Sequence, residues 1–173
     1  MPPCRSLPRL LAPLLLAVTV AVAWAQGGSD APTPAALEAR LQWAERQVAA
    51  NPGDAQARFL VGVVLMDLQR DDEAMARFQA LAQEFPELPD PQNNIALLHA
   101  RAGRLEAARV ALETALRNDP THRLARQNLG HVHLMLAVQA WEQAAATGPL
   151  EPALQRTLEG ARALLASRPL AAR

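Results

Sequence analysis

The sequence predicts an all-α fold, a short right-handed superhelical stack of helix-turn-helix units with a capping helix at each end. Three observations predict it. Half of the 173 residues are apolar, yet aromatic residues make up only 3% and Tyr is absent. Ala and Leu supply the apolar surface instead, which favours helices over strands. Residues of similar type recur every 34 positions, and Pro and Gly interrupt the chain between segments of helical periodicity.

The 34-residue period is clearest in the prolines, because Pro52, Pro86 and Pro120 are evenly spaced at that distance. Several coincidences in one phase indicate an internal repeat of one supersecondary unit. Three further sets of similar residues keep the same step: Gly62, Ala96 and Gly130; Val61, Ile95 and Leu129; Leu65, His99 and His133.

We expect the small residues of each unit to lie where helix axes come close together. A large side chain at Gly62, Ala96 or Gly130 would push the first helix of a pair beyond the ~8–10 Å typical of packed helices. Ala74 and Ala108 serve the second helices in the same way. Larger residues are expected to fill the space between pairs: Phe78, Leu112 and Trp141. The predicted helix caps are Thr33, Asp54, Asp90 and Thr121 at N-terminal ends and Gly103 at a C-terminal end.

Residues 1–25 have the pattern of a secretory signal peptide. Arg5 and Arg9 precede an apolar run, and Ala23-Trp24-Ala25 follows with small residues on both sides of a large one. We therefore expect cleavage after Ala25 and export to the periplasm. The alternative is a retained membrane anchor, but the run has only 16 residues where a spanning helix needs about 20. The single cysteine lies in this segment, so the mature chain would have no thiol.

The remaining chain divides into four predicted parts. Residues 26–33 form a polar linker, 34–51 an N-terminal capping helix, 52–149 the repeat domain, and 150–173 a C-terminal capping helix and tail. The third of the three repeat units is shortened. No Gly, Pro or Asx occurs between Gly130 and Thr147, so we expect one long helix over about 123–146. A tight hairpin is the alternative.

These motifs resemble those of the tetratricopeptide-repeat (TPR) family, whose pattern is W-x2-L-G-x2-Y, A-x3-F and P. The first unit reads Arg58-x2-Val61-Gly62-x2-Leu65, Ala74-x3-Phe78 and Pro86. The segments PELPDPQNNIALLHARAG and ARQNLGHVHLMLAVQAWEQA are also similar to small exported TPR proteins of proteobacteria. One departure is that Arg58, Gln92 and Arg126 replace the first aromatic residue. That position is therefore filled by aliphatic stems or left more open.

The resemblance implies a concave groove, lined by the first helix of each unit, that grips a peptide or a helix. Asn and Gln side chains can donate to and accept from a peptide backbone, and apolar residues can form the floor. Alternatively, the Asn side chains satisfy neighbouring helix ends or face water. A groove filled by the chain's own tail would also argue against this site. The implied groove residues are Phe59, Val63 and Met66, then Asn93, Asn94, Leu97 and Arg101, and finally Gln127, Asn128 and His131.

The expected function is a protein–protein interaction scaffold of the bacterial cell envelope. A membrane-tethered structural subunit that self-associates through apolar end helices is the alternative. The 17 basic and 17 acidic residues balance, so we expect no nucleic acid. We also expect no catalytic residues, no cofactor, no small-molecule substrate and no metal, because His131 and His133 lie on different helix faces. The resemblance also argues against recognition of an acidic C-terminus, because the positions where the family carries basic residues for that purpose are occupied here by Phe59, Val63, Asn94, Leu124 and Asn128.

Overall fold

The computed structural model describes residues 32–167 and 170–171, and it contains seven α-helices and no strand within that part of the chain. This confirms the predicted all-α stack. The predicted signal peptide and most of the linker lie outside the described residues. None of the described helices is both long and apolar enough to cross a membrane. The helices are α1 (Pro34–Ala50), α2 (Ala55–Asp67), α3 (Asp71–Glu84), α4 (Pro89–Arg101), α5 (Leu105–Asn118), α6 (Arg123–Thr147) and α7 (Pro152–Ser167).

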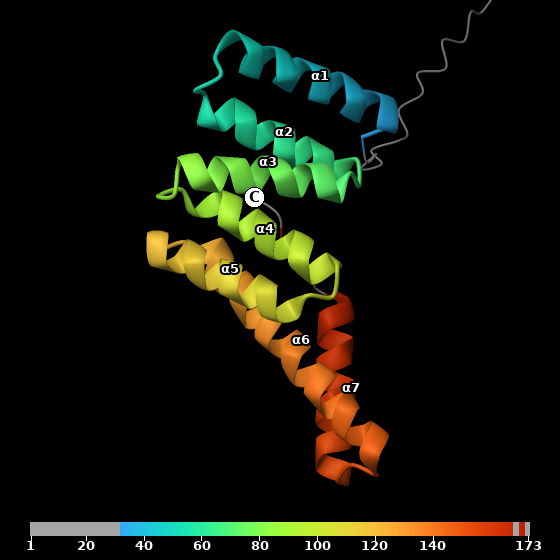
Figure 1. Cartoon of the computed structure of the whole chain (residues 1–173). Helices are drawn as coiled ribbons and strands as arrows, with labels where there is room; N and C mark the ends of the chain where they lie inside the picture. Colours follow the sequence, from blue (N-terminus) through green and yellow to red (C-terminus); the bar gives the residue numbers. More distant parts are fainter. Residues whose placement is uncertain (1–31, 168–169, 172–173) are drawn as a thin grey trace, which may run out of the picture. The chain divides into compact units, whose positions relative to one another are not determined.

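Antiparallel neighbours pack in chain order from α1 to α6 (Figure 1). The helices α2 and α3 form the first pair and α4 and α5 the second, while α1 covers α2. One apolar cluster runs through all six helices, from Leu41 in α1 to Val132 in α6. Each helix pair therefore buries its apolar faces against its neighbours, which is how a stack of repeats is stabilised.

Two of the predicted N-caps are confirmed. The backbone N–H of Ala36 donates to Thr33 Oγ1 at 3.2 Å, and that of Ala57 donates to Asp54 Oδ1 at 3.0 Å. Each side chain thus satisfies one of the free N–H groups at a helix start.

The other two predicted N-caps are wrong. The helix α4 starts at Pro89, whose fixed φ suits the first helical position, so Asp90 lies inside the first turn. The cap of α6 is His122 instead of Thr121, because His122 Nδ1 accepts from the N–H of Ala125 at 3.0 Å. The other ring nitrogen, Nε2, bonds Asp90 Oδ1 at 3.0 Å, so this cap also joins α6 to α4.

The turn within each helix pair requires a left-handed backbone. Gly103, the predicted C-cap residue, has φ of 72° and follows α4. Gln69 occupies the equivalent position after α2 and has φ of 59°. The repeat geometry therefore imposes on Gln69 a conformation that side-chain-bearing residues adopt at a cost.

Close helix approach is confirmed at one predicted glycine and is absent at another. A Cβ atom built on Gly62 would lie 2.6 Å from the fully buried ring of Phe78. A Cβ atom on Gly130 would have no atom within 4 Å, and this residue is exposed. The expectation for Gly130 was wrong because the third unit does not turn back, so no second helix packs against this position.

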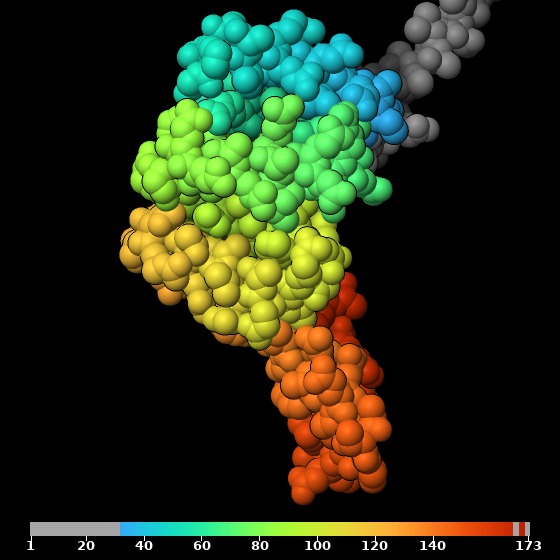
Figure 2. Space-filling model, viewed as in Figure 1, coloured from blue at the N-terminus to red at the C-terminus, as the bar shows by residue number. Residues whose placement is uncertain are grey.

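The helix α6 is continuous over 25 residues, as predicted. Its first half packs on α5 and α4, and its second half leaves the stack and packs against α7 (Figures 1 and 2). A separate apolar cluster, built on Val138, Leu158 and Ala161, holds this hairpin together. We expected Trp141 between helix pairs and the last helix over the end of the stack. Instead Trp141 belongs to the hairpin cluster, and the first half of α6 covers α5.

Candidate functional site

Six of the ten predicted groove residues line three hollows along α2, α4 and α6, whereas the four amide residues line none of these hollows: Asn93, Asn94, Gln127 and Asn128. The first, of about 410 Å³, contains Phe59 and Val63 together with Trp43 of α1. The second, of about 470 Å³, joins Met66 to Arg101. The third, of about 350 Å³, joins Leu97 and Arg101 to His131. Arg101 lines both of the last two, so residues from the first helix of every unit meet on one face.

The side chains of this face differ strongly in exposure. Half of the predicted groove residues are buried: Met66, Asn93, Asn94, Leu97 and Asn128. Phe59, Val63 and His131 are half-buried, whereas Arg101 and Gln127 are exposed. The accessible part of the groove is therefore narrower than the sequence pattern implies, and three of its four amide side chains lie beneath the surface.

Asn128 binds the backbone of the chain's own C-terminal segment. Its Nδ2 donates to the carbonyl oxygen of Ala171 at 2.8 Å, and its Oδ1 accepts from the N–H of Ala171 at 3.1 Å. The second Nδ2 proton is donated to Asn93 Oδ1 at 2.9 Å, which fixes the orientation of the amide. An amide side chain thus pairs with a peptide backbone, but that backbone is the chain's own tail. The arrangement expected to argue against the site is therefore present at Asn128, and a partner must displace the tail to bind there.

Leu170 extends this contact into the third hollow. It is half-buried, packs on the main apolar cluster, and lines the hollow with Leu97, Met135 and Leu165. The described tail residues therefore supply part of the groove wall. The sequence offered little to locate this contact, because a short segment after a terminal helix has no periodicity of its own.

Asn94 has the structural role that we considered as the alternative to peptide binding, because its side chain satisfies the end of a helix. It is fully buried, and its Nδ2 donates to the backbone carbonyl of Asp90 at 2.9 Å in the first turn of the same helix. Its Oδ1 is a buried acceptor without a hydrogen-bond partner. Asn94 and Asn128 occupy equivalent repeat positions, yet only Asn128 contacts the tail.

Charged and amide side chains border the first two hollows: Arg40, Gln47, Asp54 and Gln56 at the first, and Asp67, Gln69, Asp71 and Arg101 at the second. Arg101 pairs with Asp71 across the second hollow at 3.0 Å. Burial lowers the pKa of His131, so its ring is neutral near pH 7. Among the described residues, no group of three or more His, Cys, Asp or Glu side chains could hold a metal ion.

Comparison with known families decides what this repeat is. The sequence profile of the tetratricopeptide repeat matches residues 56–87, which cover almost all of α2 and the whole of α3. Two such helix pairs follow each other at the predicted period. The matched segment and the seven described helices support a tetratricopeptide-repeat protein. No curated protein matches the chain.

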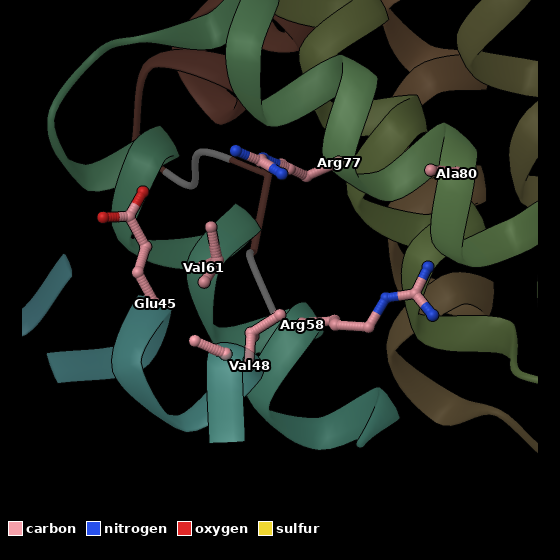
Figure 3. A pocket seen from close by; sticks show the side chains of 7 residues that line it. Glu45, Val48, Arg58, Val61, Arg77 and Ala80 are labelled. Atoms are coloured by element: carbon pink, nitrogen blue, oxygen red, sulfur yellow. The ribbon is translucent and has the colours of Figure 1, made fainter. Parts of the chain in front are cut away.

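This TPR protein departs from the repeat pattern at Arg58, where an aromatic residue is usual. The Arg58 guanidinium pairs with Glu84 and lies 5.6 Å from the ring centroid of Phe85. Figure 3 shows the hollow that results between α1, α2 and α3, with Arg58 and Arg77 projecting at its rim. The hollow has a volume of about 350 Å³, and Arg58 is one of the residues that line it.

The two histidines at the tyrosine position of the repeat behave differently. His99 is half-buried, and its Nδ1 accepts from Arg104 Nε at 3.1 Å, as expected of a packed residue with a hydrogen bond at the ring. His133 is exposed, so it does not pack as His99 does. The reason is the same as for Gly130: α6 continues where a second helix would have covered that side.

Proposed function

We propose that this TPR protein is a protein–protein interaction scaffold that binds a peptide segment of its partner along α2, α4 and α6. The observation that carries the proposal is the amide of Asn128, which binds both backbone groups of one residue. That arrangement recognises a main chain whatever its side chains are. TPR proteins in general bind protein partners and are not enzymes.

The N-terminal end of the groove adds an apolar surface to this backbone site. Phe59 and Val63 are half-buried, and the neighbouring Trp43 is 49% exposed. Apolar side chains of a partner can pack there, while Gln127 and Arg101 supply exposed polar groups farther along. A segment that spans the three hollows would combine main-chain hydrogen bonds with apolar burial.

A capture experiment with matched variants tests the groove. The protein is immobilised and exposed to an envelope extract of the source organism, and captured proteins are identified by mass spectrometry. Val63→Asp places a charge in the first hollow and is expected to reduce capture of the partner at least tenfold. Val110→Asp is the control, because Val110 is 50% exposed on α5 and lines none of the three hollows.

A photo-crosslinking residue provides the second readout, since Val63→Asp could also weaken folding. Placed at the exposed position of Gln127, it should label the partner, whereas the same residue at Val110 should not. Equal capture by both aspartate variants, together with equal labelling from both positions, would contradict partner binding in the groove.

We further propose that the protein acts in the cell envelope after export. The support is the sequence of residues 1–25, with two arginines, an apolar run and Ala23-Trp24-Ala25. N-terminal sequencing of the exported protein should find Gln26 first. The second candidate, a tethered subunit that self-associates through its end helices, is favoured by the half-exposed Trp43 and Leu164 on α1 and α7. It requires an intact N-terminus.

A further inference from the structure

We propose that the C-terminal segment is a built-in competitor of the groove and displays the chemistry of the external ligand. That ligand is a peptide with a branched aliphatic residue followed by any residue that has a free backbone N–H. The inference rests on the proposed function of the groove and adds to it the identity of the recognised segment and a regulatory contact.

The selectivity follows from the different surroundings of the two tail residues. Leu170 is half-buried in a hollow whose walls are mostly apolar, among them Leu97, Met135 and Leu165. A charged side chain there would lose part of its hydration, and the guanidinium of Arg101, which also lines the hollow, is already paired with Asp71. Ala171 is exposed, and only its backbone is bound. The site therefore selects the side chain at the first position and excludes only proline at the second, because proline has no N–H.

The side chain that binds the tail backbone is buried and held in place by another residue. Asn128 is 3% exposed, and its amide orientation is held by Asn93, which is fully buried. Three hydrogen bonds therefore meet at one rigid side chain. Hydrogen bonds in such a buried place cost most when one partner is removed, because the remaining group stays unsatisfied.

The α6–α7 hairpin explains how the tail reaches the groove. The second half of α6 leads away from the stack, and α7 returns beside it, held by Val138, Leu158 and Ala161 (Figure 1). Ala171 is only four residues beyond Ser167, the last residue of α7. That length spans at most about 14 Å. A tether this short gives the tail an effective concentration on the order of millimolar at its site.

A partner therefore needs contacts that the tail does not make. Leu170 lines the third hollow and neither of the other two. A longer segment that also fills the first hollow, around Phe59 and Val63, would have the additional free energy needed to displace the tail. The tail would then raise the selectivity of the groove for longer partners.

The test measures binding of the chain's own tail as a separate molecule. A fluorescein-labelled peptide of residues 166–173 is titrated with the full chain and with a variant that ends at Ser167, by fluorescence polarisation. The shortened variant should bind the peptide, and the full chain should bind it at least tenfold more weakly.

Changes in the peptide separate the two recognition elements without altering the protein. Leu170→Asp and an N-methylated Ala171 should each weaken binding at least tenfold, whereas Ala171→Gln should change it less than twofold. In the shortened chain, Asn128→Ala should abolish binding. Gln139→Ala is the control, because Gln139 is exposed in the same helix and lines none of the three hollows. Circular dichroism shows whether each variant keeps its helices.

Three results would overturn the inference. The first is that the shortened chain does not bind the peptide at millimolar concentration, and the second is that the two tenfold effects of the peptide changes are absent. The third is that the full chain forms dimers that truncation abolishes, which would mean that the tail binds a second copy of the chain. The proposed function fails separately. If partner capture depends on Val63 but the tail peptide does not bind, partner binding in the groove is supported and the role of the tail as a competitor is rejected.

Discussion

At the scale of single residues, equivalent positions of the repeat have different surroundings. Gly62 and Gly130 are 68 residues apart in the same phase. A side chain at Gly62 would meet the ring of Phe78, whereas a side chain at Gly130 would meet nothing. The sequence pattern treats the two glycines alike, so only the structure separates a glycine needed for packing from one that is not.

Alanine substitution of the two glycines should have opposite effects. Gly62→Ala should lower the free energy of unfolding by about 1–3 kcal/mol, because Phe78 is fully buried and cannot move aside easily. Gly130→Ala should raise it by about 0.5–1 kcal/mol, since it removes the entropic cost of glycine in an exposed helix. Urea unfolding measures both. A destabilising Gly130→Ala would mean that a partner element packs against that side of α6.

At the scale of elements, α6 belongs to two packing units. Its first half contributes Ala125 and Val132 to the main cluster, and its second half contributes Val138 to the hairpin cluster. The sequence predicted the single helix from the missing turn residues. It could not predict which helix α7 would contact, because the apolar stripe of α7 would fit the end of the stack as well.

Truncation of one core residue in each cluster should show that the hairpin opens separately. Leu158→Ala removes a side chain that is 2% exposed and should destabilise the hairpin by about 2–5 kcal/mol. Faster hydrogen exchange is expected in α7 and the second half of α6, with α2 to α5 unchanged. Leu112→Ala, in the main cluster, should instead accelerate exchange throughout α1 to α5. Identical exchange patterns would contradict two separate clusters.

At the scale of the whole molecule, stability should depend on pH below neutrality. Burial, aided by Arg104, lowers the pKa of His99, and burial lowers that of His131. The unfolded chain therefore binds protons more readily than the folded chain once the pH falls below about 6.5. The free energy of unfolding should decrease from pH 7.5 to pH 5.5. In the double variant His99→Gln, His131→Gln, the free energy of unfolding should depend less on pH over this range. An unchanged dependence would mean that other titratable groups cause it.

The sequence by itself determined the helix pairs. Their 34-residue period, the prolines that end second helices, the caps Thr33 and Asp54, and the continuous α6 follow from local rules. These features depend on residues near in the chain, and composition and spacing record such relations directly.

Only the tertiary structure decided the contacts between distant segments. Asn94 and Asn128 were predicted alike, but one supports its own helix and the other binds Ala171, 43 residues away. The position at which the C-terminal segment binds depends on the direction of the preceding helical hairpin and on which hollow is not filled by other side chains. Those are properties of the folded surface, and no local pattern in the sequence encodes them.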